Sequence, residues 1–349
     1  MGQPSTGSRF AASRPPIAEE DIAARLGAML DLPDTGTRRV MAGSTRAGTE
    51  ALMGAMAAIS GGAGRALVVA ADAPRGAPES AIDHAAGAGA AAFVLEAEGP
   101  ATITDTRSYA TVAPGTRFRG VSEGSADGLG VTQYDRQSYI ETVSEAIDQL
   151  DASDEPDAIA LQAPDGSLPY RVAGAVGDTD SIQAGSTVHR LGDLGAASVP
   201  VSLASAMADG HDQLLACSFA SGASADALAI RVDADVPHEL ALEGETELTY
   251  AEYLRVRGEI TSGAPSGGGA YVSLPTWTQS IEQRYHLEAG RCPACGALAF
   301  PPRGACPDCG ELSTYEPVRL PGTGTVEAID DDRSGWGTAG VCRAATPAR

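Results

Sequence analysis

The residues best suited to metal chemistry are four cysteines in two closely spaced pairs. Cys292 and Cys295 form one C-P-x-C-G motif, Cys306 and Cys309 form another, and ten residues separate the two motifs. Each motif places two thiolates at the tip of a tight turn, and the glycine after it permits a left-handed backbone. Four converging thiolates predict a structural zinc ion, because a full sulfur shell leaves no coordination position for water.

Two other roles for these cysteines fit the sequence less well. A disulfide framework is typical of secreted proteins, whereas the amino-terminal residues here contain no apolar signal core. A redox C-x-x-C motif follows a strand at the start of a helix, and it does not come duplicated with internal prolines. Zinc is therefore the predicted cofactor of the four cysteines.

The charge composition limits the classes of partner. The 349 residues are enough for two or more folded units, and they carry 46 acidic against 24 basic side chains, for a net charge of −22. Every basic residue in that count is arginine, and lysine is absent. This balance predicts adaptation to very high salt, where self-repulsion is screened, and it argues against nucleic-acid binding.

No segment of the sequence is expected to span a membrane. The most apolar stretch, Ala51–Ala71, is interrupted by Arg65 and by a group of glycines at 61, 62 and 64. The first sixteen residues are rich in Ser, Gly and Pro and lack the features of a secretory signal. We therefore predict a cytoplasmic protein.

The amino-terminal part reads as an α/β unit. Residues 1–17 are expected to be an irregular leader, Glu19–Leu32 a helix and Arg39–Ala42 a short strand. Gly43–Ser60 combines a tight Gly/Ser/Thr turn with a helix too apolar to be exposed, and Ala66–Ala71 follows as a strand. This arrangement presents a residue of the turn at the amino end of a buried helix, as sites in α/β folds often do.

Three segments carry a family resemblance. The sequences GSTRAGTEAL, ALVVAADAPRG and HAAGAGAAAFVL resemble the thiolase superfamily, specifically the archaeal branch of 3-hydroxy-3-methylglutaryl-CoA synthases. The resemblance covers residues 18–233 and implies a partial, layered thiolase-like α/β fold. The family has a further strand–helix–strand segment before residue 20, including a glutamate used as general acid and base. We expect the chain to be amino-terminally shortened relative to that family.

The resemblance implies replaced catalytic residues. Thr45 stands where the family has its acyl-carrying cysteine, and a hydroxyl gains less than a thiol from a helix amino terminus. Gln162 stands where the family has a histidine, and an amide cannot shuttle protons near neutral pH. Asp193 replaces an asparagine, and a carboxylate there would repel a developing oxyanion. The three changes predict a degenerate condensing site.

Cys217 is the one remaining thiol of this half of the chain. It lies in an apolar segment, Leu214–Ile230, that is expected to form the last pair of strands. Free cysteines are among the most buried residue types, so a core position is the first interpretation. The alternative is that Cys217 serves as a replacement nucleophile.

The carboxy-terminal part resembles a second family. Residues 234–285 are expected to be a linker and a lead-in helix, 286–317 a zinc ribbon and 318–349 an incomplete OB-fold segment. The ribbon, with FPPR between its motifs, resembles proteins that join a rubredoxin-like ribbon to an OB-fold and associate with acyl-CoA enzymes (DUF35). Val318–Ala328 is expected to be the first OB strand pair, left as an unpaired edge because the following tail shows no apolar alternation.

Three functions remain open. The first is a non-catalytic subunit that binds a CoA thioester and assembles with a thiolase (acetyl-CoA acetyltransferase) and synthase-like subunits, in a homo- or hetero-oligomer. The second is an active acyltransferase of the hydroxymethylglutaryl-CoA synthase type that uses Thr45 or Cys217. The third is a truncated gene remnant. The replaced residues favour the first.

Overall fold

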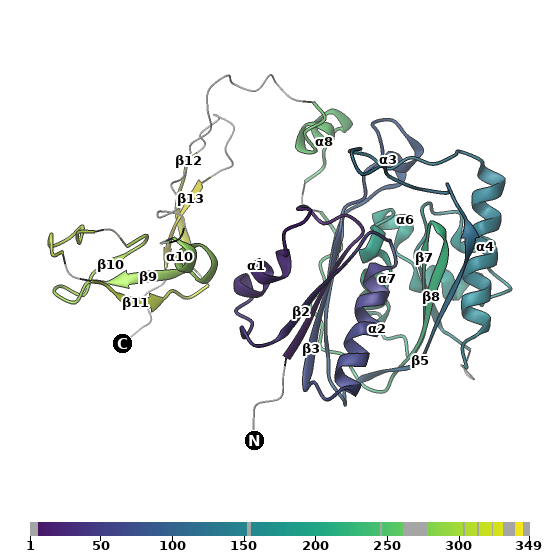
Figure 1. Cartoon of the computed structure of the whole chain (residues 1–349), viewed down its shortest axis with the longest axis horizontal. Helices are drawn as coiled ribbons and strands as arrows, with labels where there is room; N and C mark the ends of the chain where they lie inside the picture. Colours follow the sequence, from purple (N-terminus) through teal and green to yellow (C-terminus); the bar gives the residue numbers. More distant parts are fainter. Residues whose placement is uncertain are drawn as a thin grey trace. The chain divides into compact units, whose positions relative to one another are not determined.

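The computed structural model describes residues 6–151, 155–244, 246–260, 278, 280–302, 304–312, 314–322, 324–330 and 339–344. The chain forms two compact units (Figure 1). The first comprises Met1–Gly27 and Pro33–Gly263, and the second comprises Ala28–Leu32 and Ala264–Arg349.

One sheet of the first unit is built from strands near the amino terminus. Its strand order is β2-β1-β3-β4, and the strands are β1 (Thr6–Ala12), β2 (Thr37–Ala42), β3 (Arg65–Asp72) and β4 (Gly89–Leu95). β1 lies between β2 and β3 and is parallel to both, whereas β4 is antiparallel to β3. The carboxyl ends of three strands therefore meet at one edge of this sheet.

The other sheet of the first unit has the order β5-β8-β7-β6. Its strands are β5 (Ala101–Ala113), β6 (Ala158–Leu161), β7 (Gln213–Ala220) and β8 (Gly222–Val232). β6 and β7 are parallel, and the β7–β8 and β8–β5 pairs are antiparallel. Both faces of this sheet are covered, so β6 to β8 are apolar at nearly every position instead of alternating.

Two buried helices share a core with both sheets. They are α2 (Ala47–Ser60) and α7 (Ser198–Ala208). The α2 residues Ala47, Ala51 and Ala55 repeat every four positions and join this core, together with alternate residues of β3, β6, β7 and β8. Small side chains allow close approach: a Cβ on Gly48 of α2 would lie 2.1 Å from the Ala196 carbonyl oxygen.

A second core covers the opposite face of the β5–β8 sheet. It is formed by α4 (Thr132–Asp148), the one-turn helix Pro169–Arg171 and α5 (Thr179–Gly185). The remaining helices of this unit are α1 (Ile22–Met29), α3 (Ala81–Ala85), α6 (Val188–Leu191) and α8 (Tyr250–Val256), with a one-turn helix at Gly195–Ala197. The first unit is thus layered, with helices between its sheets and outside one of them.

The predicted leader is wrong for residues 6–12. This segment is β1, which occupies an interior position of the first sheet, and Phe10 and Ala11 are 4% exposed. Its Gly and Ser residues suggested a loop. However, hydrogen bonding to a strand on each side and burial between layers override the weak local strand propensity.

The other elements predicted in this unit are present. The helix predicted at 19–32 is α1, shorter at both ends because Glu19 and Asp31 have positive φ values of 64° and 55°. α4 begins at Thr132, directly after the loop at residues 114–131. The strands predicted at 39–42 and 66–71 and the last strand pair are β2, β3, β7 and β8.

The segment after residue 233, predicted as a linker and a lead-in helix, contains α8, which packs against α3. Thr249 and Glu252 form a capping box at its start. Arg257, just after the helix, forms a buried ion pair with Asp83, and the Tyr250 hydroxyl donates a hydrogen bond to the same carboxylate at 2.6 Å. α8 therefore belongs to the first unit, which extends beyond the predicted boundary at residue 233.

The docking of α8 should depend on pH through Asp83. Burial alone would raise the pKa of Asp83, but hydrogen bonds from Tyr250 and Arg257 and the charge of Arg257 hold this pKa below its ordinary value. A carboxyl with a lowered folded-state pKa contributes stability that is present above its unfolded pKa and is lost as pH falls through the folded pKa. Asp83→Asn should therefore weaken α8 docking at neutral pH by about 1.5–3 kcal/mol.

Hydrogen exchange of the α8 amides measures this effect. We expect exchange at least about tenfold faster in Asp83→Asn than in the unchanged protein at pH 7. The difference should begin to shrink below about pH 4 and should disappear only as the pH falls through the lowered folded-state pKa of Asp83, where the carboxyl of the unchanged protein is also protonated. Equal exchange at neutral pH would show that the ion pair does not hold α8.

The second unit contains a small three-stranded sheet with the order β10-β9-β11. Its elements are α10 (Ile281–His286), β9 (Glu288–Arg291), β10 (Leu298–Ala299) and β11 (Glu316–Arg319). A separate antiparallel pair joins β12 (Gly324–Asp330) to β13 (Ala339–Ala344). Among the described residues, no helix combines the length and apolar composition needed to cross a bilayer.

The strand pairing predicted after residue 317 is wrong. β11 pairs with β9 and so belongs to the ribbon sheet, while β12 pairs with β13 in the tail that was expected to lack a strand. Val318–Ala328 is therefore neither a strand pair of its own nor an unpaired edge. Antiparallel pairing needs complementary backbone edges more than apolar alternation, which explains why the pattern of the tail did not reveal β13. The assignment of residues 318–349 to an incomplete OB-fold segment remains a prediction.

Candidate functional site

Thr45 lies in the turn between β2 and α2. Gly43, with a φ of +88°, reverses the chain after β2. Thr45 comes next but one, two positions before Ala47, the first residue of α2. The Thr45 hydroxyl donates a 2.5 Å hydrogen bond to the backbone carbonyl of Phe219 on β7. The proton of this hydroxyl is therefore held by a neutral acceptor that cannot remove it.

Gln162 immediately follows β6 and is 2% exposed. Its backbone NH donates to the Cys217 carbonyl, and its own carbonyl accepts from the Tyr139 hydroxyl at 3.2 Å. Its side-chain Nε2 donates to Asp193 Oδ1 at 3.2 Å. The amide oxygen is buried without a hydrogen-bond partner among the described residues. This side chain can orient a ligand by hydrogen bonding but cannot act as a base.

Asp193, which accepts the hydrogen bond from Gln162, is also buried. Its side chain is 3% exposed, and its carboxylate accepts from the Gly195 NH at 2.9 Å and from the Ser198 hydroxyl at 3.3 Å and pairs with Arg117 Nη1 at 2.6 Å. The repulsion predicted between Asp193 and an oxyanion is thus offset by a guanidinium that sequence reasoning did not assign. Arg117 belongs to the sequence RFRG in the loop at residues 114–131. This pair of closely spaced arginines was the only hint in the sequence of a cation near the site.

The structure brings the three replaced positions to neighbouring places on the second sheet. Gln162 and Asp193 are in direct contact. Thr45 is linked to them through β7, because it bonds the carbonyl of Phe219 and Gln162 bonds that of Cys217, two residues earlier on the strand. Two residues of a strand span about 7 Å. Thr116 extends the same region by a hydrogen bond between its hydroxyl and that of Ser221.

Cys217 faces away from this site. Successive side chains of β7 alternate, so Ser218 points to α2 and contacts Thr49, whereas Cys217 joins the core beneath α4. Cys217 is fully buried, and burial, followed by the charge of Asp226, raises the pKa of its thiol well above the ordinary value. The placement agrees with a core residue and gives no route to a thiolate nucleophile.

A buried polar cluster lies beside Thr45 that sequence reasoning missed. Asp226 of β8 is 1% exposed and accepts hydrogen bonds from Ser108 at 2.6 Å and from Thr49 at 3.0 Å. Arg46 Nε lies 3.2 Å from the same carboxylate. Burial raises the pKa of Asp226, against the effects of Ser108 and Arg46. The alternation of Asp226 with alanines was the only signal in the sequence.

Asp72 ties three loops together at the same end of the first sheet. Its carboxylate accepts from the backbone NH of Ser13 at 2.8 Å and of Ala196 at 2.9 Å. These contacts give Asp72 a structural role in holding the loops together. The histidines lie elsewhere: His189 contacts Tyr170, and His84 stacks on Tyr250.

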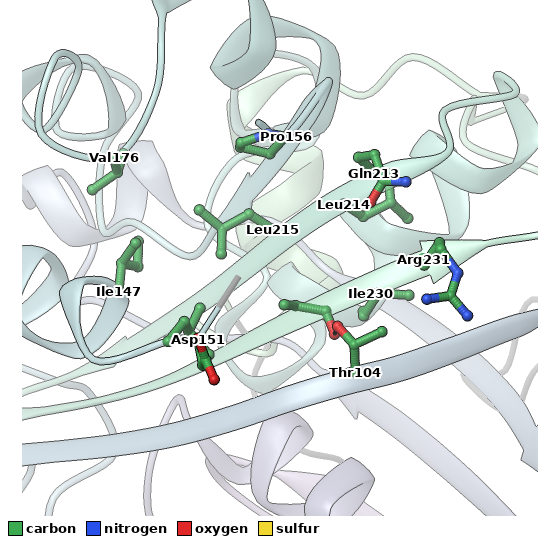
Figure 2. A pocket seen from close by; sticks show the side chains of 12 residues that line it. Thr104, Ile147, Asp151, Pro156, Val176, Gln213, Leu214, Leu215, Ile230 and Arg231 are labelled. Carbon is green, nitrogen blue, oxygen red and sulfur yellow. Dashed lines mark hydrogen bonds between the residues drawn. The ribbon is translucent and has the colours of Figure 1, made fainter. Parts of the chain in front are cut away.

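A cavity of about 260 Å³ lies at the other end of the second sheet (Figure 2). It is lined by the first residues of β7 and the last residues of β8, including Leu214 and Arg231, and by Leu150 at the end of α4. Thr45, Gln162 and Asp193 are not among its lining residues. The cavity is therefore separate from the candidate site.

The four paired cysteines converge in the second unit. Their Sγ atoms all lie within 4.8 Å of one another, with Cys292 to Cys309 at 3.7 Å and Cys295 to Cys306 at 3.6 Å. Tetrahedral zinc with Zn–S bonds of about 2.3 Å requires sulfur atoms about 3.8 Å apart. The geometry of the four thiols fits such an ion.

The turns that present these cysteines have the predicted backbone. Gly296 and Gly310 have φ values of +78° and +75°, and each donates its NH to the carbonyl of the first cysteine of its motif. The backbone amides of Cys309 and Asp308, together with the neighbouring thiols, lower the pKa of the Cys306 thiol to about 7. Hydrogen bonds with neighbouring thiols and burial instead raise the pKa values of Cys295 and Cys309, so of these three groups Cys306 most readily forms the thiolate that binds metal.

Comparison with known proteins separates the two parts of the chain. Residues 280–313 match the ChsH2 rubredoxin-like zinc ribbon domain. The hydroxymethylglutaryl-CoA synthase of Aeropyrum pernix is 26% identical over 234 residues, which are 62% of this chain and 64% of that protein. The corresponding enzyme of Methanococcoides burtonii is 28% identical over 236 residues, 62% of this chain and 67% of the enzyme. The matched part thus spans about two thirds of these relatives.

Solved structures show the fold. The structure titled MvaS in complex with 3-hydroxy-3-methylglutaryl coenzyme A superposes with a TM-score of 0.56 at 17% identity, over 66% of this chain and 68% of that one. The 3-oxoacyl-(acyl carrier protein) synthase III of Pseudomonas aeruginosa gives 0.57 at 19% identity, over 66% and 78%. The protein combines a thiolase-like α/β fold, similar in sequence to hydroxymethylglutaryl-CoA synthases, with a ChsH2-type rubredoxin-like zinc ribbon.

Proposed function

We propose that this protein is a non-catalytic subunit that binds a CoA thioester and assembles with a thiolase- or synthase-type acyltransferase. The observation that carries the proposal is the state of the Thr45 hydroxyl, which donates its proton to the Phe219 carbonyl. Among the described residues, no histidine or carboxylate accepts a hydrogen bond from it. A hydroxyl without a base is a weak nucleophile toward a thioester.

The rest of the site supports binding without chemistry. Asp193 is paired with Arg117 and accepts a hydrogen bond from Gln162, so its carboxylate is already engaged and is not available as a base. Structures of the same fold are titled as complexes with CoA and with 3-hydroxy-3-methylglutaryl-CoA, which supports a CoA thioester as ligand here. The covalent step would then take place on the partner enzyme.

The ribbon is proposed to hold a structural zinc ion. Cys292, Cys295, Cys306 and Cys309 supply the four sulfur ligands, and zinc would supply the cross-link that fixes the two turns to each other. Four thiolates complete the tetrahedral shell, so this site offers no position for a substrate or a water molecule.

Labelling with radioactive acetyl-CoA at molar salt tests the absence of a nucleophile. We expect no acid-stable protein label on the unchanged chain. Thr45→Cys should gain label, because a thiol at the amino end of the 14-residue α2 is far more nucleophilic than a hydroxyl. Ser44→Cys, one residue earlier in the same turn, is the matched control and should gain much less.

Two results would count against the proposal. Stoichiometric label on the unchanged chain, mapped by mass spectrometry to Thr45, would favour an active acyltransferase, as the names of the relatives suggest. Equal labelling of Thr45→Cys and Ser44→Cys would show that Thr45 does not occupy a nucleophile position.

A further inference from the structure

Three arginines gather around the loop at residues 114–131, close to the candidate site. Arg14 follows β1 by two residues, Arg75 follows β3 by three, and Arg119 is part of the loop itself. β1 and β3 are parallel neighbours, so their carboxyl ends lie side by side at one edge of the sheet. Arg14 and Arg75 therefore lie close together at this edge of the first sheet.

Hydrogen bonds fix all three residues to one short turn of this loop. Arg14 donates to the Gly124 carbonyl, and Arg119 donates to the carbonyl of the preceding residue, Glu123, at 2.9 Å. The backbone carbonyl of Arg75 accepts from the Ala126 NH at 2.7 Å. The three guanidinium-bearing residues thus border a segment only four residues long.

The positive charge of this cluster is not balanced by carboxylates. In the part of the chain that the structure describes, none of the three arginines forms an ion pair, although the chain carries 46 acidic residues. The pKa of Arg14 is lowered by burial and then by the charges of Arg119 and Arg75, so the guanidinium groups are close enough to repel one another.

Acidic side chains of the same loop, and those that pair with Arg257, bond other groups. Glu123 accepts from the Gly120 NH at 2.9 Å, and Asp127 accepts from the Gly128 NH at 2.7 Å. Asp83 and Glu259 both pair with Arg257, whose carbonyl accepts from Arg75 Nη1 at 3.4 Å. The exposed guanidinium groups of Arg75 and Arg119 remain open to an anion from solvent.

We propose that Arg14, Arg75 and Arg119 form a binding site for the phosphate groups of a nucleotide-containing ligand, namely CoA. A phosphate or diphosphate placed among three guanidinium groups would relieve their mutual repulsion and accept paired hydrogen bonds from each. The same loop links this site to the candidate site: Arg117, which pairs with Asp193, lies two residues before Arg119, about 7 Å along an extended chain. This inference rests on the proposed function for the identity of the ligand.

Calorimetry with CoA, pantetheine and pyrophosphate tests the site on the full chain at one fixed ionic strength. We expect Arg75→Gln and Arg119→Gln each to weaken CoA binding about tenfold through loss of a charge-assisted contact, with pantetheine binding unchanged. Arg65→Gln is the matched control, because Arg65 lies at the opposite end of β3 in an ion pair with Glu96. Its CoA affinity should equal that of the unchanged protein.

The outcomes separate this inference from the proposed function. If CoA binds and the Arg75 and Arg119 variants bind it as tightly as the control, the phosphate site is refuted and the proposed function stands. If neither CoA nor pantetheine binds, the proposed function fails. In that case, pyrophosphate binding that is weaker in both variants than in the unchanged protein would support an anion site. The anion site would be refuted if pyrophosphate did not bind, or if it bound the variants as tightly as the unchanged protein.

Discussion

Replacing Cys306 with serine is expected to abolish stoichiometric zinc binding and to unfold the ribbon. The four sulfur atoms lie within 4.8 Å of one another, and the ribbon sheet contains a strand of only two residues, β10, and strands of four residues, β9 and β11. So small a core cannot offset the conformational entropy of the chain without a cross-link. Apparent binding free energies of structural zinc are about 10–16 kcal/mol, and this energy is lost with the site.

Metal content per chain and heat-induced unfolding measure this effect. We expect one zinc per unchanged chain and none in Cys306→Ser. The variant should also lack the heat-induced unfolding transition of the ribbon, and a strong chelator should remove the same transition from the unchanged protein. Cys217→Ser is the matched control, since it removes one thiol from the first unit and leaves the ribbon ligands intact. Full zinc occupancy in Cys306→Ser would mean that the metal is held by other residues.

The order of elements in the first unit could be predicted because its signals are local. The apolar helix after a glycine turn, α2, and the continuous apolar strands β3, β7 and β8 are visible in composition alone. β1 could not be predicted, because the short sequence TGSRFAA becomes a strand only through pairing with β2 and β3. β13 was missed for another reason: it pairs with the preceding strand, β12, but its sequence AGVCRA shows no apolar alternation.

The candidate site was predicted by residue identity but not by its contacts. Thr45, Gln162 and Asp193 were singled out from motif positions, whereas their partners Phe219 and Arg117 lie 174 and 76 residues away from Thr45 and Asp193. Such partners follow from the fold and leave no periodicity in the sequence. The convergence of the four ribbon cysteines could be predicted because their spacing is itself the geometry of two turns.

Replacing Arg117 with leucine should destabilise the first unit strongly. The Arg117 and Asp193 side chains are 16% and 3% exposed, and the ion pair between them is 2.6 Å long. Without Arg117 the Asp193 carboxylate would stay buried beside Leu194 and Gly195, with only hydrogen bonds from neutral groups. Removing one partner of a buried ion pair costs about 3–5 kcal/mol, largely from the charge left uncompensated.

A double-mutant comparison separates the charge from packing. Asp193→Asn in the Arg117→Leu background removes the orphaned charge and should recover more than half of the lost free energy of unfolding, measured by urea titration. Arg65→Leu serves as the control, because its pair with Glu96 has side chains 63% and 40% exposed and should contribute no more than about 1 kcal/mol. If Arg117→Leu costs no more than Arg65→Leu, Arg117 does not neutralise the site. The carboxylate would then be free to act on a bound thioester, and the assignment of a silent site would have to be abandoned.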